Sequence, residues 1–456
     1  MSFLDENYLL GNATARALYE TVAGLPIIDA HNHADVKAIA ENHASADLWE
    51  AEAATDHYVW EMLRKRGVPE KYITGTEVSN EEKWLSLSNV FEEFAGSPTF
   101  EWVHLDLRRR FGIEEVISPA TGRKIWDAAL KQLKTPAMKP QALLQAQKVE
   151  RMCSTDDPLD TLEHHRALAA SPIAGVVRPT YRPDKAMNIF KPDWNDYIGR
   201  CETVAGAKFR NLAELLTFLK ERHDYFAANG CVASDHGVET PWALDVPYDD
   251  ADALFRKARA GKPLTAAEQQ AYMSFLLHSF GAMDAEKGWV FQLHLGCVRD
   301  IRGSLFKNVG PDSGGDISNH TIDIVVPLRD FLNRFDDRLK VVIYCLEPGH
   351  QATLAALTRA FGVKVSLGSA WWLNDSPIGM KRQLEYIGSV DLLWNSAGMV
   401  SDSRKLMSYG SRHEMFRRVL CDVVGGMVEH GQIPTTLAER LVRHLCYQRP
   451  RDLFGL

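Results

Sequence analysis

The sequence predicts an α/β fold: a distorted (β/α)₈ TIM-type barrel with a helical insertion after the first strand. Short, nearly continuous apolar runs alternate with helix-patterned stretches, and such runs are typical of strands buried on both faces of a parallel sheet. The runs also end in polar clusters, as expected where catalytic side chains lie at the carboxyl ends of barrel strands. The eight runs are 25–33, 149–157, 171–181, 230–237, 288–296, 339–347, 362–372 and 392–402.

The spacing of these runs divides the chain into three parts. The long interval between the first two runs has helical patterning throughout. We therefore expect residues 1–33 to form an N-terminal segment and the first barrel strand, residues 34–148 a helical insertion, and residues 149–456 the rest of the barrel with C-terminal helices. The Gly-, Ser- and Asp-rich segment 303–320 is long for a connection without regular structure, which predicts a mobile lid.

Composition narrows the class of protein. The 456 residues carry a formal net charge of −8, which argues against a general nucleic-acid binder. The apolar runs are far shorter than the roughly 20 residues needed to span a bilayer. The acidic N-terminal stretch does not resemble a secretory signal, and the seven cysteines lack a CxxC pattern. We expect a cytoplasmic enzyme that acts on a small molecule without nucleic-acid or membrane partners, and a homo-oligomer is compatible with the sequence.

A metal site is predicted at the end of the first run. His31 and His33 are two residues apart on a strand, so both imidazoles point to the same face and can reach one divalent cation. Asp402 ends the eighth run, next to the first in a closed barrel, and completes a ligand set suited to zinc or manganese. His294 is equally well interpreted as a further ligand, a substrate contact or a buried barrel-lining histidine. We expect one metal ion, and Asp235 with its neighbour His236 keeps a second metal ion as an alternative.

Arginines follow several of the runs. Their planar guanidinium groups favour bidentate binding of carboxylate or phosphate, which indicates an anionic substrate. No Gly-rich dinucleotide or P-loop motif is present, so we expect no nucleotide cofactor. The arginines in question are Arg178, Arg182, Arg299, Arg302 and Arg404.

Three further groups are ambiguous on the residues alone. Asp56 is most simply a helix N-cap, although the two residues that follow it, His57 and Tyr58, are able to transfer protons. Trp371 fits an aromatic wall for a sugar ring, but ordinary core packing explains it at least as well. The arginines at 412 and 417–418 are expected on a solvated or salt-bridged helix face.

Several long segments together carry a resemblance to a known family: LPIIDAHNH (25–33), DHYVWEMLRKRGV (56–68), CSTDDPLDTLEHH (153–165), GSAWWLND (368–375) and GMVSDSRKLMSYGSRHEMFRRVLC (398–421). These segments resemble the uronate isomerases, the hexuronate branch of the amidohydrolase superfamily. The resemblance runs nearly from end to end and implies a distorted (β/α)₈ barrel. It also implies interconversion of D-glucuronate with D-fructuronate, and of D-galacturonate with D-tagaturonate, in hexuronate catabolism.

The resemblance implies roles for individual residues. The HxH pair and the DSR motif imply His31, His33 and Asp402 as metal ligands. The DHY motif reverses the preference for a simple cap and makes His57 and Tyr58, together with Asp402, candidates for proton transfer between C2 and C1 through an enediol or enediolate. The substrate contacts expected from these motifs and from the strand ends are Arg182, Arg404, His294 and Trp371.

Two other functions compete with this interpretation. A mononuclear metal-dependent hydrolase of the same superfamily, acting on an anionic substrate, has the same barrel, because one barrel hosts many chemistries. A sugar-acid-binding protein without catalytic activity is the other alternative. The presence of the HxH, DSR and DHY motifs in one chain argues for the isomerase.

Overall fold

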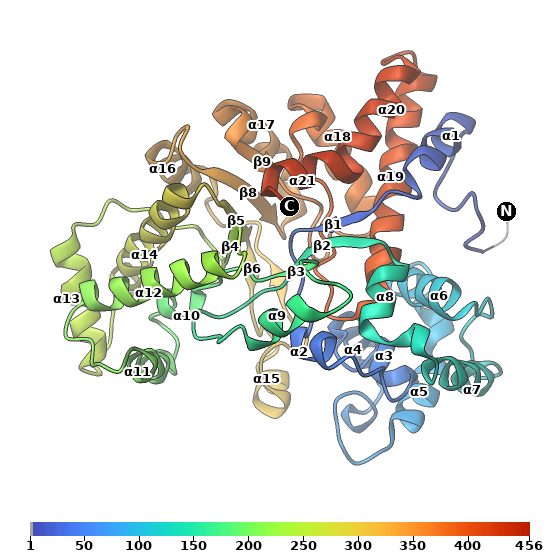
Figure 1. Cartoon of the computed structure of the whole chain (residues 1–456), viewed down its shortest axis with the longest axis horizontal. Helices are drawn as coiled ribbons and strands as arrows, with labels where there is room; N and C mark the ends of the chain where they lie inside the picture. The colour runs from blue at the N-terminus through green and yellow to red at the C-terminus, as the bar shows by residue number, and fades with distance from the viewer. Residues whose placement is uncertain (1–2) are drawn as a thin grey trace.

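The computed structural model describes residues 3–456 and shows a mixed α/β fold built around short parallel strands (Figure 1). Each of the first seven apolar runs coincides with a strand shorter than the run, although β4 ends one residue beyond its run, at Val238. Two further short strands, β6 and β7, lie between the fifth and sixth runs. The strands are β1 (Ile27–Asp29), β2 (Val149–Cys153), β3 (Val177–Arg178), β4 (Ala233–Val238), β5 (Val290–Leu295), β6 (Cys297–Val298), β7 (Ile317–Ser318), β8 (Lys340–Cys345) and β9 (Val365–Leu367).

Within residues 3–456 the main strands form two parallel sheets, with orders β1-β2-β3 and β4-β5-β8-β9. The backbone of Tyr181 bridges them: its N–H donates to Ala233 O at 3.2 Å, and its carbonyl accepts from Asp235 N at 3.0 Å. The strands of the second sheet are buried almost throughout, which explains their continuous apolar character. In the part of the chain that the structure describes, the strands form separate sheets and not one closed ring.

The prediction of a strand in the eighth run was wrong. Leu393–Asn395 forms a 3₁₀ turn, and the rest of 392–402 has no regular structure. Isolated hydrogen bonds do join this segment to its neighbours: Ala397 N donates to Leu367 O at 3.0 Å, and Asp402 N donates to His31 O at 3.2 Å. The reason is local, because Gly398 and Asp402 have φ of 88° and 50°, outside the range of a strand.

Helices surround the sheets. Several begin and end at the signals expected from sequence: α14 starts with a capping box of Thr265 and Glu268 and stops at Gly288, where φ is 67°. The helices are α1 (Ala13–Val22), α2 (Val36–Glu41), α3 (Leu48–Glu52), α4 (His57–Lys65), α5 (Asn80–Ser88), α6 (Pro98–Phe111), α7 (Gly122–Leu133), α8 (Pro140–Ala146), α9 (Glu163–Ala167), α10 (Asp184–Met187), α11 (Trp194–Ala205), α12 (Leu212–Ala228), α13 (Tyr248–Arg259), α14 (Ala266–Lys287), α15 (Gly303–Val309), α16 (Val325–Arg334), α17 (Gln351–Phe361), α18 (Pro377–Val390), α19 (Tyr409–Glu429), α20 (Thr435–Arg443) and α21 (Arg449–Phe454).

Helices α2 to α8 lie between β1 and β2 in the chain and gather on one side of the molecule (Figure 1). Val36 and Ile39 of α2 pack with apolar residues of β1, β2 and β3. Helices α3 to α8 share a core of their own, made of apolar side chains from residues 48–143 together with Met407. Trp49, Trp84 and Phe91 are fully buried in it. A separate, larger core packs the second sheet against the helices of the C-terminal two-thirds of the chain.

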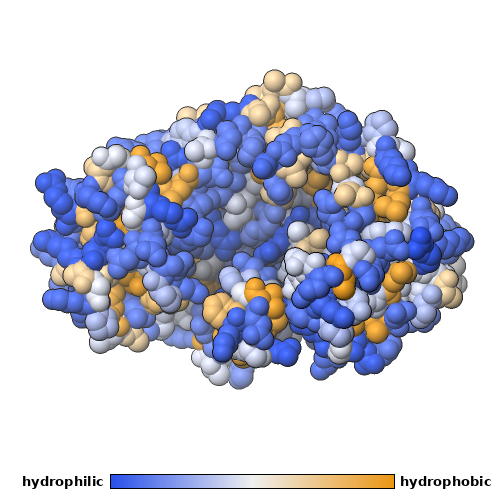
Figure 2. Space-filling model, turned by 90° about the horizontal axis from the view of Figure 1, so that it is seen from below, coloured by the Kyte–Doolittle hydropathy of each residue, from blue (hydrophilic) through white to orange (hydrophobic). Residues whose placement is uncertain are grey.

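The segment 303–320, predicted to be a lid without regular structure, contains α15 and the strand β7, which pairs with β6. Figure 2 shows the face of the molecule seen from below, where mostly hydrophilic residues surround a hollow near the middle. Throughout residues 3–456, every helix is too short or too polar to cross a membrane.

Candidate active site

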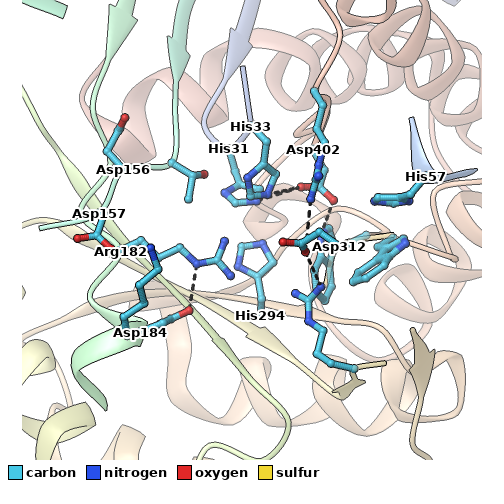
Figure 3. Close-up of a pocket in the computed structure, with 16 residues that line it drawn as sticks. His31, His33, His57, Asp156, Asp157, Arg182, Asp184, His294, Asp312 and Asp402 are labelled. Atoms are coloured by element: carbon cyan, nitrogen blue, oxygen red, sulfur yellow. Dashed lines mark hydrogen bonds and ion pairs between the residues drawn. The ribbon is translucent and has the colours of Figure 1, made fainter. Parts of the chain in front are cut away.

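A cavity of about 430 Å³ lies at the carboxyl ends of the parallel strands (Figure 3). Its volume falls in the range typical of small-molecule sites. Residues that follow β1, β2, β3, β5 and β9 line it together with the 402–404 segment and the start of α4. The lining residues are His31, His33, His57, Thr155, Asp156, Asp157, Arg182, Asp184, Lys185, His294, Arg299, Asp312, Trp371, Trp372, Asp402 and Arg404.

His31, His33 and Asp402 meet on one wall of this cavity. Asp402 Oδ1 lies 3.2 Å from His31 Nε2 and 3.2 Å from His33 Nε2. The backbone brings them together, since Asp402 N donates to His31 O and His33 N donates to Ser403 O. Asp402 is one of the few non-glycine residues with positive φ, a conformation that aspartate tolerates better than most residues.

These three side chains fit a divalent cation. One nitrogen or oxygen from each lies within 4.8 Å of the others, and Asp402 Oδ1 is buried without a hydrogen-bond partner. Burial opposes ionisation of Asp402, yet the imidazoles beside it hold its pKa well below the ordinary value. Burial also lowers the pKa of His33. An ionised carboxylate and a neutral imidazole are the forms that bind metal.

His31, Asp235 and His294 form a second group of potential ligands, and its carboxylate already pairs with the Arg182 guanidinium group. Asp235 Oδ2 lies 3.0 Å from an Arg182 guanidinium nitrogen, and its Oδ1 lies 2.6 Å from His294 Nδ1. His236 points elsewhere: its ring stacks on Phe291 with centroids 4.1 Å apart. The oxygens of Asp235 are therefore already paired, whereas among residues 3–456 Asp402 Oδ1 faces only His31 and His33.

Two arginines share one carboxylate at the cavity. Arg299 and Arg404 each place a terminal nitrogen 3.7 Å from Asp312 Oδ1. Figure 3 shows Asp312 in the cavity with dashed lines to its ion-pair partners. Arg299 also pairs with Asp316 at 2.9 Å and lies over the Trp372 ring, 5.0 Å from its centroid. The space between the two guanidinium groups thus already accepts a carboxylate group.

His57 lines the cavity and Tyr58 does not. Asp56 is the N-cap of α4, as its position in the sequence predicted, and so sets where both residues start the helix. Burial, reinforced by Arg404, lowers the pKa of His57 to about 4, so its imidazole is neutral at physiological pH. The Tyr58 hydroxyl donates to Asp375 (3.1 and 3.2 Å to its two oxygens), behind the cavity wall.

His294 and Trp371 both lie beside the group of His31, His33 and Asp402. Trp371 Nε1 donates to Asp402 Oδ2 at 2.9 Å, so the indole orients this carboxylate as well as lining the cavity. His294 stacks on Tyr344 with ring centroids 4.4 Å apart, and burial lowers its pKa to about 4. A buried neutral imidazole at this place is suited to hydrogen bonding with a ligand.

The comparisons with known proteins bear on the whole chain. A family model described as glucuronate isomerase matches residues 1–454. The chain belongs to the glucuronate isomerase family. The uronate isomerase of Thermotoga neapolitana is 51% identical over 452 residues, which cover 99% of this chain and 99% of that protein.

Solved structures of glucuronate isomerase family members agree with this assignment. The crystal structure of uronate isomerase from Thermotoga maritima has a TM-score of 0.97 and 51% sequence identity, with all of both chains covered. The crystal structure of glucuronate isomerase from Caulobacter crescentus has a TM-score of 0.95 at 27% identity and covers 100% of this chain and 97% of that chain. The family resemblance found in the sequence is therefore confirmed.

Sequence reasoning missed some side chains around this site in the glucuronate isomerase fold. Asp312 lies in the Gly-, Ser- and Asp-rich segment 303–320, which was interpreted as a lid and not as part of the site. Arg412 was expected on a solvated or salt-bridged helix face; it does pair with Asp375, but it is buried (4% exposed) and lies over the Trp102 ring, 3.7 Å from its centroid. Lys405, next to the DSR motif, is also buried. No local pattern distinguishes these residues from surface charges.

Proposed function

We propose that the protein interconverts D-glucuronate with D-fructuronate, and D-galacturonate with D-tagaturonate. The observation that carries this proposal is the Asp312 carboxylate between Arg299 and Arg404, in the same cavity as the His31, His33 and Asp402 group. A hexuronate combines the two features that this cavity would recognise, a carboxylate and a chain of hydroxyl oxygens. Membership of the glucuronate isomerase family supports the same substrate class.

One divalent metal ion, zinc or manganese, is the proposed cofactor. His31, His33 and Asp402 would hold it, because their ligand atoms converge, Asp402 is held ionised and burial favours the neutral imidazole of His33. When bound, such an ion supplies Lewis acidity that favours negative charge on substrate oxygens. No nucleotide is needed, since the reaction moves hydrogen within one molecule.

The reaction itself is a balanced internal transfer. One proton leaves C2 and one arrives at C1. At the same time the hydroxyl proton moves from the C2 oxygen to the C1 oxygen, and the carbonyl double bond moves from C1 to C2, through an enediol or enediolate. A base near C2 and an acid near the C1 oxygen are required. His57 and Asp402 line the cavity and are the candidates for direct proton transfer, and Tyr58 is a candidate that would have to act from behind the wall.

The remaining cavity residues would hold the substrate. Arg404, together with Arg299, would bind the substrate carboxylate in place of Asp312, because guanidinium groups favour paired contacts with carboxylates. Arg182, His294 and Trp371 would contact its oxygens and the face of its carbon chain. The guanidinium of Arg182 is fixed in advance by Asp184 and Asp235, each 3.0 Å away.

The proposal extends to the architecture. The two parallel sheets and the segment 396–403 would form the interrupted wall of a distorted (β/α)₈ barrel, with 1–33 contributing its first strand. Residues 34–148 would be a helical insertion and 149–456 the remainder. The separate core of the helices between β1 and β2 supports this division. We place the protein in the cytoplasm, as a monomer or homo-oligomer, with small sugar acids as its partners.

Proton NMR of D-glucuronate with the pure protein in D₂O, with and without a strong chelator, tests the function. We expect the ketouronate to appear with deuterium at C1, because a proton passed through a side chain exchanges with solvent. The absence of a ketose from both D-glucuronate and D-galacturonate, with zinc or manganese added, would refute the proposal. A product that gains the mass of water would instead identify a hydrolase.

A further inference from the structure

A buried lysine lies just behind the cavity wall. The Lys405 side chain is 6% exposed, and its Nζ lies 3.0 Å from Glu52 Oε2, 3.3 Å from Asp56 Oδ2 and 3.3 Å from Asp106 Oδ2. We name these four residues the Lys405 cluster. The carboxylates come from three places in the helical region: Glu52 ends α3, Asp56 precedes α4, and Asp106 lies in α6.

Both sides of this cluster lead directly to the cavity. On one side, Lys405 follows Arg404 in the chain and lies three residues after Asp402, and both of those residues line the cavity. On the other side, Asp56 is followed by His57, which lines the cavity from the helical region. A single ion pair, between Lys405 and Asp56, therefore joins the two segments.

The two oxygens of Asp56 have different partners. Oδ1 accepts hydrogen bonds from the backbone N–H groups of Tyr58 (3.0 Å) and Val59 (3.4 Å), which fixes the first turn of α4. Oδ2 faces the Lys405 ammonium group at 3.3 Å. Any movement of this ammonium group is consequently transmitted through one carboxylate to the start of the helix that carries His57.

The physical cost of disturbing the cluster is large because it is buried. Removing one partner of a buried ion pair leaves an uncompensated charge, which the surrounding structure must move to solvate. Glu52 and Asp106 hold the same ammonium group, but α3 and α6 contribute no residue to the cavity lining. Only the Asp56 branch connects Lys405 to a cavity residue on α4.

We propose that Lys405 is a positioning residue: through Asp56 it sets the place of His57 relative to Asp402 and Arg404 during isomerisation. This inference rests on the proposed function, in which His57 faces the substrate. Lys405 itself does not touch the substrate. Its contribution is to hold together two cavity walls that come from distant parts of the chain.

The test compares substitutions at different branches of the cluster in the intact protein. Asp56→Asn removes the charge facing Lys405 while keeping a side chain that caps helices well. Asp106→Asn is the matched control, since it makes the same exchange in a buried aspartate that also lies 3.3 Å from the ammonium group. Lys405→Met removes the hub, and Lys405→Arg restores its charge. Each variant is assayed for kcat and KM with D-glucuronate, and for amide hydrogen exchange.

We expect Lys405→Met and Asp56→Asn to lower kcat about 10-fold or more, because displacement of a reacting group by about 1 Å is costly. KM should stay within about two-fold, as the arginines are untouched, and Lys405→Arg should recover part of the loss. Asp106→Asn should keep kcat within about two-fold. The Tyr58 and Val59 amides should exchange faster in Lys405→Met than in Asp106→Asn.

Equal kcat in Asp56→Asn and Asp106→Asn would overturn the inference, because the two branches would then be equivalent. If Lys405→Met does not fold, the comparison of these two variants still tests the inference. If the wild-type protein isomerises no hexuronate, the proposed function fails, and the exchange comparison tests the positioning role alone. Equal exchange at Tyr58 and Val59 in Lys405→Met and Asp106→Asn would then reject the positioning role.

Discussion

The two walls of the cavity are held in place by different kinds of interaction. The strand-end wall carries His31, His33 and His294, and the parallel sheets fix it through many backbone hydrogen bonds of similar strength. The helical wall contributes His57, and a cluster around one buried ammonium group ties it to the rest of the site. The contacts that hold the strand-end wall are thus spread over many backbone groups, whereas those of the helical wall centre on the Lys405 ammonium group.

This difference shows how a site can be sensitive in two ways. On the strand-end wall, a substitution should matter when it removes a group that faces the substrate. On the helical wall, a substitution behind the cavity surface should matter too, because the contacts of the Lys405 cluster depend on one buried ammonium group. The four predictions below test the two walls from the largest expected effect to the smallest.

Asp402→Asn should have the largest effect, on the strand-end wall. Asparagine tolerates the positive φ of this position, so the backbone should be preserved. The loss of an ionised acid–base and ligand group should lower kcat/KM about 10³-fold. Initial-rate measurements with D-glucuronate check this, with Asp300→Asn as control, because Asp300 also has positive φ and lies outside the cavity lining. A loss below about 10-fold would contradict the role of Asp402.

Arg404→Met should lower kcat/KM by about 10- to 100-fold, with most of the change in KM. A hydrogen bond to a charged group contributes about 1.5–3 kcal/mol, and one such contact to the substrate carboxylate would be lost. Arg302→Met is the control, since the Arg302 side chain is exposed and does not line the cavity. Unchanged kinetics in Arg404→Met would refute the assignment of Arg404 to the substrate.

The helical wall should depend on pH through Glu52. Burial raises the pKa of Glu52 from its ordinary value of 4.5 to about 8, so the folded state binds this proton more tightly than the unfolded state. The stabilisation is complete below pH about 4.5 and is lost as the pH rises towards 8. Urea unfolding should show the free energy of unfolding falling over that window by about 1 kcal/mol per pH unit. Glu52→Gln, which mimics the neutral acid, should lack this component, and parallel pH curves would contradict the prediction.

Asp312→Asn should have the smallest effect and the opposite sign. Asp312 competes with the substrate carboxylate for Arg299 and Arg404, so its neutralisation should lower KM for D-glucuronate about two- to five-fold. The effect is small because the Asp312 side chain is 59% exposed, and exposed ion pairs are weak. Steady-state kinetics check it, again with Asp300→Asn as control. A raised KM would mean that Asp312 contacts the substrate directly.

Much of the fold was accessible from local sequence. The apolar run 339–347 predicted a buried strand, and β8 occupies Lys340–Cys345. The run 392–402 is also partly apolar and largely buried but forms no strand, because its path turns at Gly398 and Asp402. Local hydrophobicity reports burial, and it does not report the backbone angles that decide whether a buried segment is extended.

The site was accessible in part for the same reason. The spacing of His31 and His33 predicted that both imidazoles face one way, and the structure brings them to Asp402. The burial of Lys405 and Arg412 was not predicted, because it depends on tertiary contacts. Lys405 pairs with Glu52, which is 353 residues away in the chain, and Arg412 pairs with Asp375, which precedes another helix. A charged residue in a helical pattern is usually exposed, and only tertiary contacts identify the exceptions.

The interval from Asp402 to Lys405 has a consequence for how this protein can change over time. Within four residues, the chain places two side chains in the cavity and a third in the Lys405 cluster on its far side. Most surface loops accept added or deleted residues at little thermodynamic cost. Here a single inserted residue would displace Asp402 and Arg404 relative to Lys405, which is fixed by its carboxylate partners. We therefore expect the interval from Asp402 to Lys405 to keep its length in every active variant of this protein, even where neighbouring loops gain or lose residues.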